Sequence, residues 1–291
     1  FKALEALLSN TALDCTVKII LEGDEEHGSL GTAEALEQHR DLIRADYLLS
    51  CDSGAVAPGV PTLTMGLRGI AMFTVHLQGP SHDLHSGIHG GRAPNPAAGM
   101  ARLLSSLYQA DGAIAVQGFY EGVADPTPEE RALAGAIPFD PTLYHSQTGV
   151  DPVGGETRFT PQERTGFRPA IEINGIHSGY GGEGSKTIIP ASALAKISMR
   201  LVAGQDPRHC LDLAIRHLEK NAPPGLRLDI SGQQIGGPAL RLNLNSPLLN
   251  SDNGVCHRTL TIVVGVNAQR SLNLRPRVIK SLLNIQRQGA T

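Results

Sequence analysis

Two adjacent carboxylates, Glu25 and Glu26, follow an apolar, β-rich run at residues 15–21. A carboxyl group in an apolar setting can have its pKa raised enough to move protons near neutral pH, whereas a neighbouring carboxylate that binds a cation stays ionised. Such a pair of base and ligand suits metal-assisted hydrolysis. The alternative is a solvated acidic turn, since Asp24 and the two glutamates precede a helix expected from about Gly31, and carboxylates favour the positive end of a helix dipole.

A third carboxylate, Asp52, follows a second apolar run at residues 46–51 and precedes a Ser-Gly turn signal. The carboxyl ends of parallel strands lie at one edge of an open α/β sheet, and ligands bind there. We therefore expect the two runs to be neighbouring strands, connected by a helix over Thr32–Ile43, so that Asp52 meets the glutamate pair. The alternative for Asp52 is a turn-capping role.

Arg200 lies in a segment, Leu194–Val202, whose apolar residues alternate with polar ones, which is typical of a half-buried strand. The alternation places Arg200 on the face that points away from the core. A guanidinium on a rigid strand is suited to bidentate recognition of a carboxylate. The alternative is an arginine that is merely solvated. The apolar face is formed by Ala195, Ile197, Met199 and Leu201.

The segment Gly79–Gly91 contains three histidines among several glycines. The imidazole of His85 can donate to a developing oxyanion, and the neighbouring glycines would let the backbone approach a ligand closely. A local metal site formed by His82, His85 and His89 is disfavoured, because the glycines argue against the helix that would align these side chains.

The length and composition of the chain limit the number of domains, the partners and the compartment that can be expected. A chain of 291 residues exceeds the usual size of one domain, so two domains are expected. No window approaches the length of a membrane span, and the net charge of -3 argues against general nucleic-acid binding, so neither a membrane nor nucleic acid is expected as a partner. The four cysteines have no paired spacing, which favours a reducing compartment and a cytoplasmic location.

The order of elements predicts a two-layer α+β domain inserted into an α/β domain. Helix and strand alternate up to about Gly66, and a long strand is expected over Ile70–Leu77. Asp206 and Pro207 indicate the start of an amphipathic helix that ends near Lys220. The other expected elements are a helix from Pro96 to about Ala110, loops with one short helix (Pro128–Ala136) over residues 113–167, and a strand over Leu226–Ile230.

Three motifs resemble those of the dizinc exopeptidases of peptidase family M20, within its carnosinase-like cytosolic dipeptidase branch. They are Glu-Gly-x-Glu-Glu-x-Gly-Ser at 22–29, Asp-Leu-His-Ser-Gly-x-x-Gly-Gly at 83–91, and Gly-Ser-Lys-Thr-Ile-Ile-Pro at 184–190, which runs into Arg200. The second motif is the most specific because of its length. The likeness extends from Phe1 to about Leu249.

The resemblance implies a role for each matching residue. Glu25 would be the general base, Glu26 a ligand of one zinc and Asp52 a ligand of the other. His85 would stabilise the oxyanion and reach into the active site of the partner subunit. Arg200 would bind the C-terminal carboxylate of a small peptide substrate.

The resemblance also implies an architecture. Residues 1–67 would belong to an open α/β zinc-exopeptidase catalytic domain, and residues 68–239 would form the inserted two-layer α+β lid, through which a homodimer assembles. Residues 240–291 would be a remnant of the catalytic domain followed by an atypical basic tail. The complete protein would hold two Zn2+ ions, with Mn2+ or Co2+ as alternatives.

Part of the family's metal site has no counterpart in this chain. The family has a histidine and a bridging aspartate upstream of the glutamate pair, yet no histidine precedes Glu25, and Phe1 is not an initiating residue. The chain is therefore expected to be the interior of a longer protein, with weak or no zinc binding and no activity as a fragment. The family's C-terminal histidine ligand has no clear match either, since His257 lies in a tail that does not resemble the family. That tail, residues 250–291, carries six basic residues against one acid and is expected to be an unrelated extension or the result of a frame error or truncation.

The function expected of the complete protein is metal-dependent hydrolysis of dipeptides or short peptides with a free C-terminal carboxylate. One alternative is an N-acyl amino acid amidohydrolase, such as a deacetylase or desuccinylase. Another is a non-catalytic dimerisation module built on the lid. A third, nucleic-acid binding, depends only on the basic tail.

Overall fold

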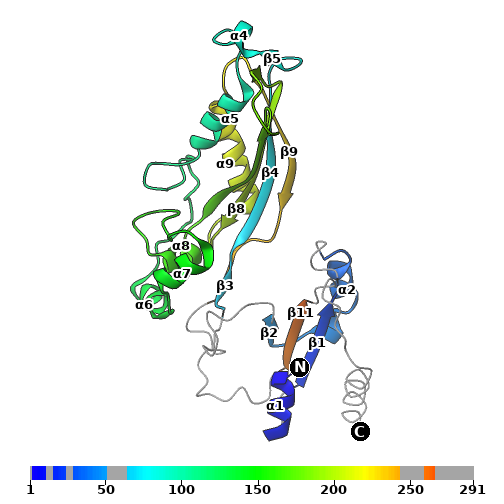
Figure 1. The fold of residues 1–291 in the computed structure, drawn as a ribbon. Coiled ribbons are helices and arrows are strands. Elements are labelled where there is room, and N and C mark those ends of the chain that lie inside the picture. The colour runs from blue at the N-terminus through cyan, green and yellow to red at the C-terminus, as the bar shows by residue number, and fades with distance from the viewer. Residues whose placement is uncertain (1, 11–15, 24–28, 51–63, 243–258, 266–291) are drawn as a thin grey trace. The chain divides into compact units, whose positions relative to one another are not determined.

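The computed structural model describes the chain except for residues 1, 11–15, 24–28, 51–63, 243–258 and 266–291 (Figure 1). The chain divides into two compact units, one formed by Phe1–Gly54 with Asn245–Thr291 and the other by Ala55–Leu244. The predicted lid, residues 68–239, falls within the second unit. None of the described helices is long and apolar enough to cross a membrane.

The first unit contains a three-stranded parallel sheet. β1 (Thr16–Glu22) and β2 (Tyr47–Ser50) correspond to the two apolar runs that the sequence predicts as strands. They are not neighbours, however, because β11 (Thr259–Gly265) pairs with both, and the strand order is β1-β11-β2. The expectation of adjacent strands was therefore wrong. The expectation was wrong because the tail that contains β11 had been interpreted as unrelated to the fold. A run of β-branched residues can nevertheless join a sheet through backbone hydrogen bonds alone.

Thr32, in the connection between β1 and β2, is hydrogen-bonded to the end of β1. Thr32 donates from Oγ1 to Oε1 of Glu22 at 2.6 Å, and hydrogen bonds from Thr32 and Ser29 lower the pKa of the Glu22 carboxyl. The single helix expected over Thr32–Ile43 is interrupted at His39, whose φ of -114° is not helical. Three short helices complete the described part of this unit: α1 (Lys2–Asn10), α2 (Thr32–Gln38) and α3 (Arg40–Ile43).

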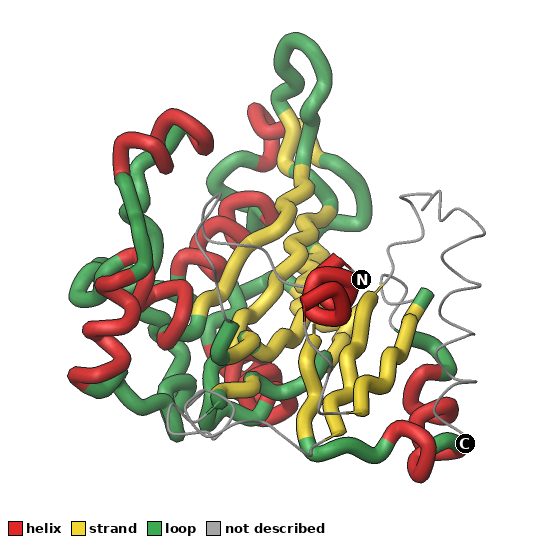
Figure 2. Tube along the Cα trace, turned by 90° about the horizontal axis from the view of Figure 1, so that it is seen from below, coloured by secondary structure: helices red, strands yellow, loops and turns green. Residues whose placement is uncertain are grey.

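The second unit is a four-stranded antiparallel sheet covered on one face by two helices (Figures 1 and 2). The sheet order is β6 (Ala170–Ser178), β8 (Ser192–Leu201), β4 (Gly69–Gln78), β9 (Arg227–Ile235). The helices are α5 (Pro96–Ser105) and α9 (Pro207–Lys220). These elements form the two-layer α+β arrangement that the sequence predicts, although α5 ends before the expected Ala110.

The core lies between the sheet and these helices. Every second residue of the two central strands is buried, because successive side chains of a strand point to opposite faces. Phe73 and Leu77 of β4 are 2% and 0% exposed and pack with Met100 of α5 and Leu211 of α9. Full burial of one such side chain stabilises the fold by about 1.5–3 kcal/mol.

A helical segment extends from the sheet at residues 111–168, where the sequence predicts only one helix. That helix, α6 (Pro128–Ala136), is present with the predicted bounds. Two further helices, α7 (Pro141–Thr148) and α8 (Pro161–Phe167), were missed. Both carry start signals, since an Asp-Pro pair opens α7, and Thr160 and Glu163 form a capping box at α8.

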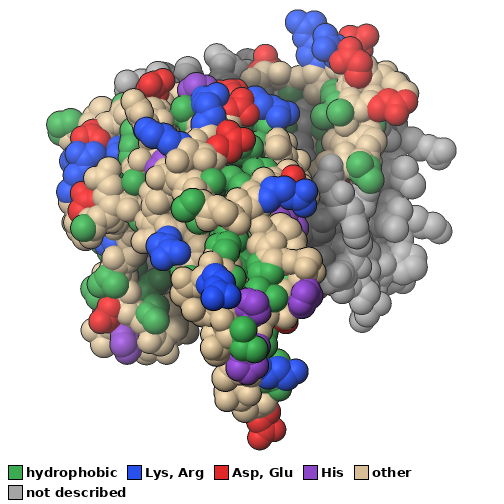
Figure 3. All heavy atoms as spheres, turned by 90° about the horizontal axis from the view of Figure 1, so that it is seen from above, with side chains coloured by type: hydrophobic (Ala, Val, Ile, Leu, Met, Phe, Trp, Pro, Cys, Tyr) green, Lys and Arg blue, Asp and Glu red, His purple; other side chains and the backbone are tan. Residues whose placement is uncertain are grey.

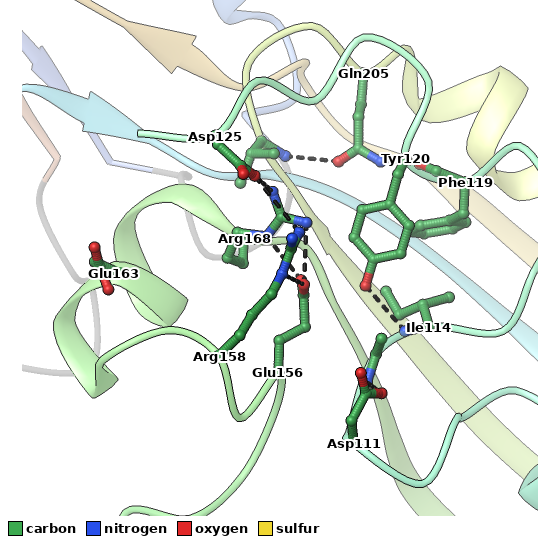
Figure 4. A network of polar contacts seen from close by, with 12 residues as sticks. Asp111, Ile114, Phe119, Tyr120, Asp125, Glu156, Arg158, Glu163, Arg168 and Gln205 are labelled. Carbon is green, nitrogen blue, oxygen red and sulfur yellow. Dashed lines mark hydrogen bonds and ion pairs between the residues drawn. The ribbon is translucent and has the colours of Figure 1, made fainter. Parts of the chain in front are cut away.

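A buried ion pair holds this helical segment together (Figure 4). The guanidinium of Arg168, 4% exposed, donates to both carboxylate oxygens of Glu156, 5% exposed, at 2.7 and 3.1 Å. Arg168 also donates to Asp125 at 3.1 Å, and its Cζ lies 5.0 Å and 4.5 Å from the ring centroids of Tyr120 and Phe159. The charge is therefore paired, hydrogen-bonded and enclosed by aromatic rings, the conditions under which a buried charge is tolerated.

The chain enters and leaves the second unit side by side. β3 (Gly66–Leu67) pairs with β10 (Leu240–Arg241) in an antiparallel ribbon, and the amide of Leu242 donates to the carbonyl of Met65 at 2.8 Å. Arg241 forms an ion pair with Glu130 of α6, and its guanidinium lies over the ring of Phe167. The first and last segments of the unit are thus paired with each other, as expected for an inserted domain.

Candidate active site

His85 lies at the end of the second unit that carries a small antiparallel ribbon. β5 (Leu84–His85) pairs with β7 (Ile188–Ile189), and the amide of Ser86 donates to the carbonyl of Thr187 at 2.9 Å. His85 is exposed and serves as the N-cap of the short helix α4 (Ser86–His89), because its Nδ1 accepts from the amide of Gly87 at 3.0 Å. Figure 3 looks down on this end and shows histidine side chains gathered with basic ones.

The cap hydrogen bond fixes the tautomer of neutral His85. Since Nδ1 accepts a hydrogen bond, the ring proton is on Nε2, which leaves an N–H donor on an exposed side chain. Gly87 makes this arrangement sterically accessible, because a Cβ at that position would lie 2.8 Å from Cε1 of His85. The geometry therefore presents a single donor with a defined direction, which is what an oxyanion requires.

The two glycine-containing motifs of this unit are held against each other. Oδ1 of Asp83 accepts from the amide of Ala191 at 2.8 Å, and the amide of Gly79 donates to the carbonyl of the same residue at 2.9 Å. Next to them, Nζ of Lys186 lies 4.4 Å from the ring centroid of Tyr180. The motif at 83–91 and the motif at 184–190 thus form one structural element.

The three histidines of this segment do not share a ligand geometry. α4 includes only His89 of the three, and His82 makes its contact with Ser81, at 3.0 Å between Nδ1 and Oγ. Within the described ranges, no group of three or more His, Cys, Asp or Glu side chains could hold a metal ion.

Arg200 projects from the sheet face opposite the helices, as the sequence predicts. It is exposed, whereas Met199 and Leu201 on either side of it are 0% exposed. Its neighbours across the strands are Ile70 of β4 and Ala170 of β6. In the described part of the chain the Arg200 guanidinium makes no ion pair and no side-chain hydrogen bond, so its donors are available to a ligand.

A second arginine, Arg68, lies near Arg200 and was not identified from the sequence. Arg68 is exposed, although partial desolvation of its guanidinium lowers the pKa, and repulsion from Arg200 lowers that pKa further. Glu172 of β6 acts in the opposite direction. Arg68 lies between β3 and β4, outside both strands.

The remaining predicted site residues, Glu25, Glu26 and Asp52, lie outside the described residues, as does His257. The strands that precede the three carboxylates are described. Because β1 and β2 are both parallel to β11, with Glu22 paired to Gly265 and Val263 paired to Ser50, their carboxyl ends lie at the same edge of the sheet.

Residues 65–226 match the family model described as Peptidase dimerisation domain. The chain belongs to this family of M20 peptidases. The resemblance stated from the motifs is therefore confirmed, and so is the fold class of an α/β protein with an inserted α+β dimerisation domain.

Curated relatives and solved structures of the M20 family agree with this assignment. The chain is 34% identical over 209 residues to the Beta-Ala-His dipeptidase of Rattus norvegicus, covering 71% of this chain and 42% of the relative. It is 30% identical over 213 residues to the Cys-Gly metallodipeptidase dug1 of Schizosaccharomyces pombe, covering 72% and 44%. Human carnosine dipeptidase 1 superimposes with a TM-score of 0.63 at 28% identity, over 78% of this chain and 48% of that structure. An M20 family metallo-carboxypeptidase from Sulfolobus solfataricus has the same TM-score and identity, over 77% and 57%.

The chain spans less than half the length of these two curated relatives.

Proposed function

We propose that the complete protein is a metal-dependent hydrolase that cleaves dipeptides or short peptides with a free C-terminal carboxylate. The observation that carries the proposal is the exposed Nε2–H donor of His85, whose direction is fixed by the bond from Gly87 to Nδ1. The printed names of the relatives, a Beta-Ala-His dipeptidase and a Cys-Gly metallodipeptidase, support the reaction class.

In this proposal two described residues bind the substrate. Arg200 holds the terminal carboxylate, because its guanidinium has no partner among the described residues and projects from a rigid strand. His85 donates from Nε2 to the oxygen of the scissile carbonyl as negative charge develops there. Arg200 lies near the end of the sheet where β4 begins, whereas the His85 ribbon is bonded to Ala191 near the end where β4 finishes, so one substrate would meet Arg200 of one subunit and His85 of the other.

Three carboxylates outside the described residues complete the proposal. Glu25 would accept the proton of the attacking water, while Glu26 and Asp52 would each bind one of two divalent metal ions, Zn2+ with Mn2+ or Co2+ as alternatives. When bound, such ions polarise a carbonyl and lower the pKa of water. The described residues contain no metal-binding group of their own, and two carboxylates are fewer ligands than two zinc sites need. The complete metal site is therefore assigned to the whole protein.

The proposed assembly is a homodimer formed through the lid, residues 68–239, in which His85 of one subunit serves the active site of the other. The description of the matched family as a dimerisation domain supports this assembly. A cytoplasmic location is proposed with it, and neither nucleic acid nor a membrane is expected as a partner.

Turnover of two matched substrates tests the reaction class. A full-length version of the protein should hydrolyse a dipeptide such as β-alanyl-histidine faster than N-acetyl-histidine, which keeps the terminal carboxylate but lacks the free amine. Faster cleavage of the N-acetyl compound would favour the N-acyl amino acid amidohydrolase alternative. Cleavage of neither compound in the presence of Zn2+ or Mn2+ would contradict both.

A second function, that of a non-catalytic dimerisation module, is favoured by the same family description. Light scattering of the 291-residue chain tests it. A dimer at tens of micromolar, together with no turnover, would support the module. A strict monomer at that concentration would contradict it.

A further inference from the structure

The described part of the second unit begins and ends in one short ribbon. β3 and β10 pair over two residues each, and the amide of Leu242 adds one hydrogen bond to the carbonyl of Met65 at 2.8 Å. An isolated two-stranded ribbon is marginally stable in water. Burial of apolar surface adds little here, because Leu67 and Leu240 are 60% and 57% exposed. A contact outside the ribbon is therefore needed to fix its position.

Arg241 of β10 supplies such a contact with the helical segment, residues 111–168. Its guanidinium forms an ion pair with Oε1 of Glu130 on α6, and its Cζ lies 5.0 Å from the ring centroid of Phe167 on α8. The side chains of Glu130 and Arg241 are 13% and 32% exposed, so salt screens this pair less than it screens a surface pair. The other carboxylate oxygen, Oε2, accepts from the amide of Thr127 at 2.8 Å. Arg241 thus binds a carboxylate whose position is already fixed.

The helical segment is in turn fixed to the sheet. α6 and α8 are joined by the ion pair of Arg131 with Glu163, whose side chain is 6% exposed. Arg168, which is buried and paired with Glu156, lies close before the start of β6 in the sequence (Figure 4). A continuous series of contacts therefore connects the ribbon with the four-stranded sheet.

Apart from these contacts, the ribbon is attached to the sheet by a glycine-containing connection. The amide of Gly236 donates to the carbonyl of Ile70 at 2.9 Å, and Gly237 and Pro238 then lead into β10. A Cβ at Gly237 would have no atom within 4 Å, so packing does not restrict the backbone there. A few such residues suffice for a hinge. Loss of the Arg241 contacts would therefore let the ribbon bend at this connection.

We propose that Arg241 is a positioning residue for the hydrolysis, because it fixes to the helical segment the ribbon through which the chain enters and leaves the second unit. The inference rests on the proposed function, in which Arg200 and His85 of this unit must meet the substrate. A stiff ribbon raises the fraction of molecules in which those two side chains are correctly placed before the substrate binds.

This role predicts a specific kinetic effect. When the binding-competent state is only partly populated, the apparent affinity for a ligand is reduced by that fraction, whereas turnover of the bound complex is preserved. Loss of Arg241 should therefore raise KM and leave kcat nearly unchanged. A general loss of folded protein would instead lower kcat and leave KM unchanged, because fewer molecules would be active.

Hydrogen exchange in the 291-residue chain tests the contact itself. Arg241→Gln should accelerate exchange of the Leu242 amide, which is bonded across the ribbon, by about tenfold, the factor that corresponds to one hydrogen bond to a charged group. Exchange in the central strand β4 should not change. The matched control is Arg158→Gln, because Arg158 also pairs with a carboxylate and lies over an aromatic ring, yet both partners, Glu156 and Phe159, belong to the helical segment. This control should leave exchange at Leu242 unchanged.

Two further variants separate a specific contact from a loss of stability. Glu130→Gln removes the charge that binds Arg241 but keeps the cap of α6, since glutamine also serves in a capping box. It should accelerate exchange at Leu242, and its combination with Arg241→Gln should have less effect than the two single effects added together. Arg241→Lys retains the charge and should restore most of the protection. If Arg241→Gln does not fold, the Glu130→Gln variant decides.

Kinetics of a full-length version test the positioning role. With β-alanyl-histidine as substrate, Arg241→Gln should raise KM about fivefold with kcat unchanged, and Arg241→Lys should restore KM. Arg158→Gln should leave both constants unchanged.

The outcomes separate this inference from the proposed function. Unchanged exchange at Leu242 in the Arg241→Gln variant, or equal acceleration throughout β4, would overturn the role of Arg241 in fixing the ribbon. The expected exchange together with an unchanged KM would overturn its positioning role and leave the proposed function standing. A full-length version that cleaves no peptide would contradict the proposed function and the positioning role together, and the exchange results would still decide whether Arg241 fixes the ribbon.

Discussion

The carboxylate of Asp83 accepts a hydrogen bond from the amide of Ala191 at 2.8 Å, and this bond joins two segments that are far apart in the sequence. The strand pair β5 and β7 continues the contact, and His85 follows within the same ribbon. The position of the His85 ring therefore depends on the anchor at Asp83, because α4 is too short to be stable on its own.

Replacement of the anchor should loosen the ribbon. Asp83→Ala removes the acceptor of the Ala191 amide, and a hydrogen bond to a charged group contributes about 1.5–3 kcal/mol, less where water competes. We expect hydrogen exchange at Ala191 to accelerate about tenfold or more. The control is Asp229→Ala on the distant edge strand β9, which should not alter exchange at Ala191. Unchanged exchange in Asp83→Ala would mean that the ribbon does not need this bond.

The buried pair of Arg168 and Glu156 gives a stability prediction. Glu156→Gln leaves the guanidinium of Arg168 without its main counter-charge, and removal of one partner of a buried pair costs about 3–5 kcal/mol. Urea unfolding of the second unit should show this loss. The control is Asp151→Asn, since Asp151 is 69% exposed in its pair with His145, and its loss should cost less than about 1 kcal/mol. Similar midpoints for the two variants would contradict the prediction.

The thiol of Cys210 gives a prediction about pH. The pKa of this thiol is raised from 9.0 to about 11, chiefly by burial and also by the negative charge of Asp206. At pH 8 about one thiol in a thousand is then ionised, so iodoacetamide should not label Cys210 in the folded chain. A raised thiol pKa stabilises the fold below pH 9, and that contribution is lost as the pH rises towards 11. Peptide mapping after labelling, with and without urea, checks the expectation, and rapid labelling without urea would refute it.

Local signals in the sequence predicted the elements that depend on local chemistry. Asp206 and Pro207 indicated the start of α9, and the side chain of Asp206 accepts from the amide of His209 at 2.7 Å. The same kind of signal at Thr160 and Glu163 could have revealed α8, since both halves of the capping box are formed there. The alternation around Arg200 predicted its exposure because burial follows the two-residue period of a strand.

Long-range pairing could not be predicted in the same way. The insertion of β11 between β1 and β2 depends on which distant segments share backbone hydrogen bonds, and periodicity carries no information about that choice. The roles of Glu25, Glu26 and Asp52 stay predictions, because these residues lie outside the described ranges.

Zinc retention tests the expected state of the metal site in this chain. Glu26 and Asp52 would supply one ligand to each of two ions, and binding weakens steeply as ligands are lost from the usual three or four. After dialysis against a weak chelator, the 291-residue chain should keep less than ~0.1 zinc per molecule by mass spectrometry. A full-length version treated in parallel should keep its zinc. Stoichiometric zinc in the 291-residue chain would show that other residues complete the site.

A mixed dimer tests the proposed action of His85 across subunits. In a full-length version, Glu25→Ala and His85→Ala should each abolish most activity as homodimers, because every active site then lacks either its base or its oxyanion donor. In a heterodimer of the two variants, one site combines both defects and the other has neither. About half of the unsubstituted activity per dimer should therefore return. The control mixes Glu25→Ala with a Glu25→Ala, His85→Ala double variant, in which no site is intact and no activity should return. Verified heterodimers without rescue would place His85 in the active site of its own subunit.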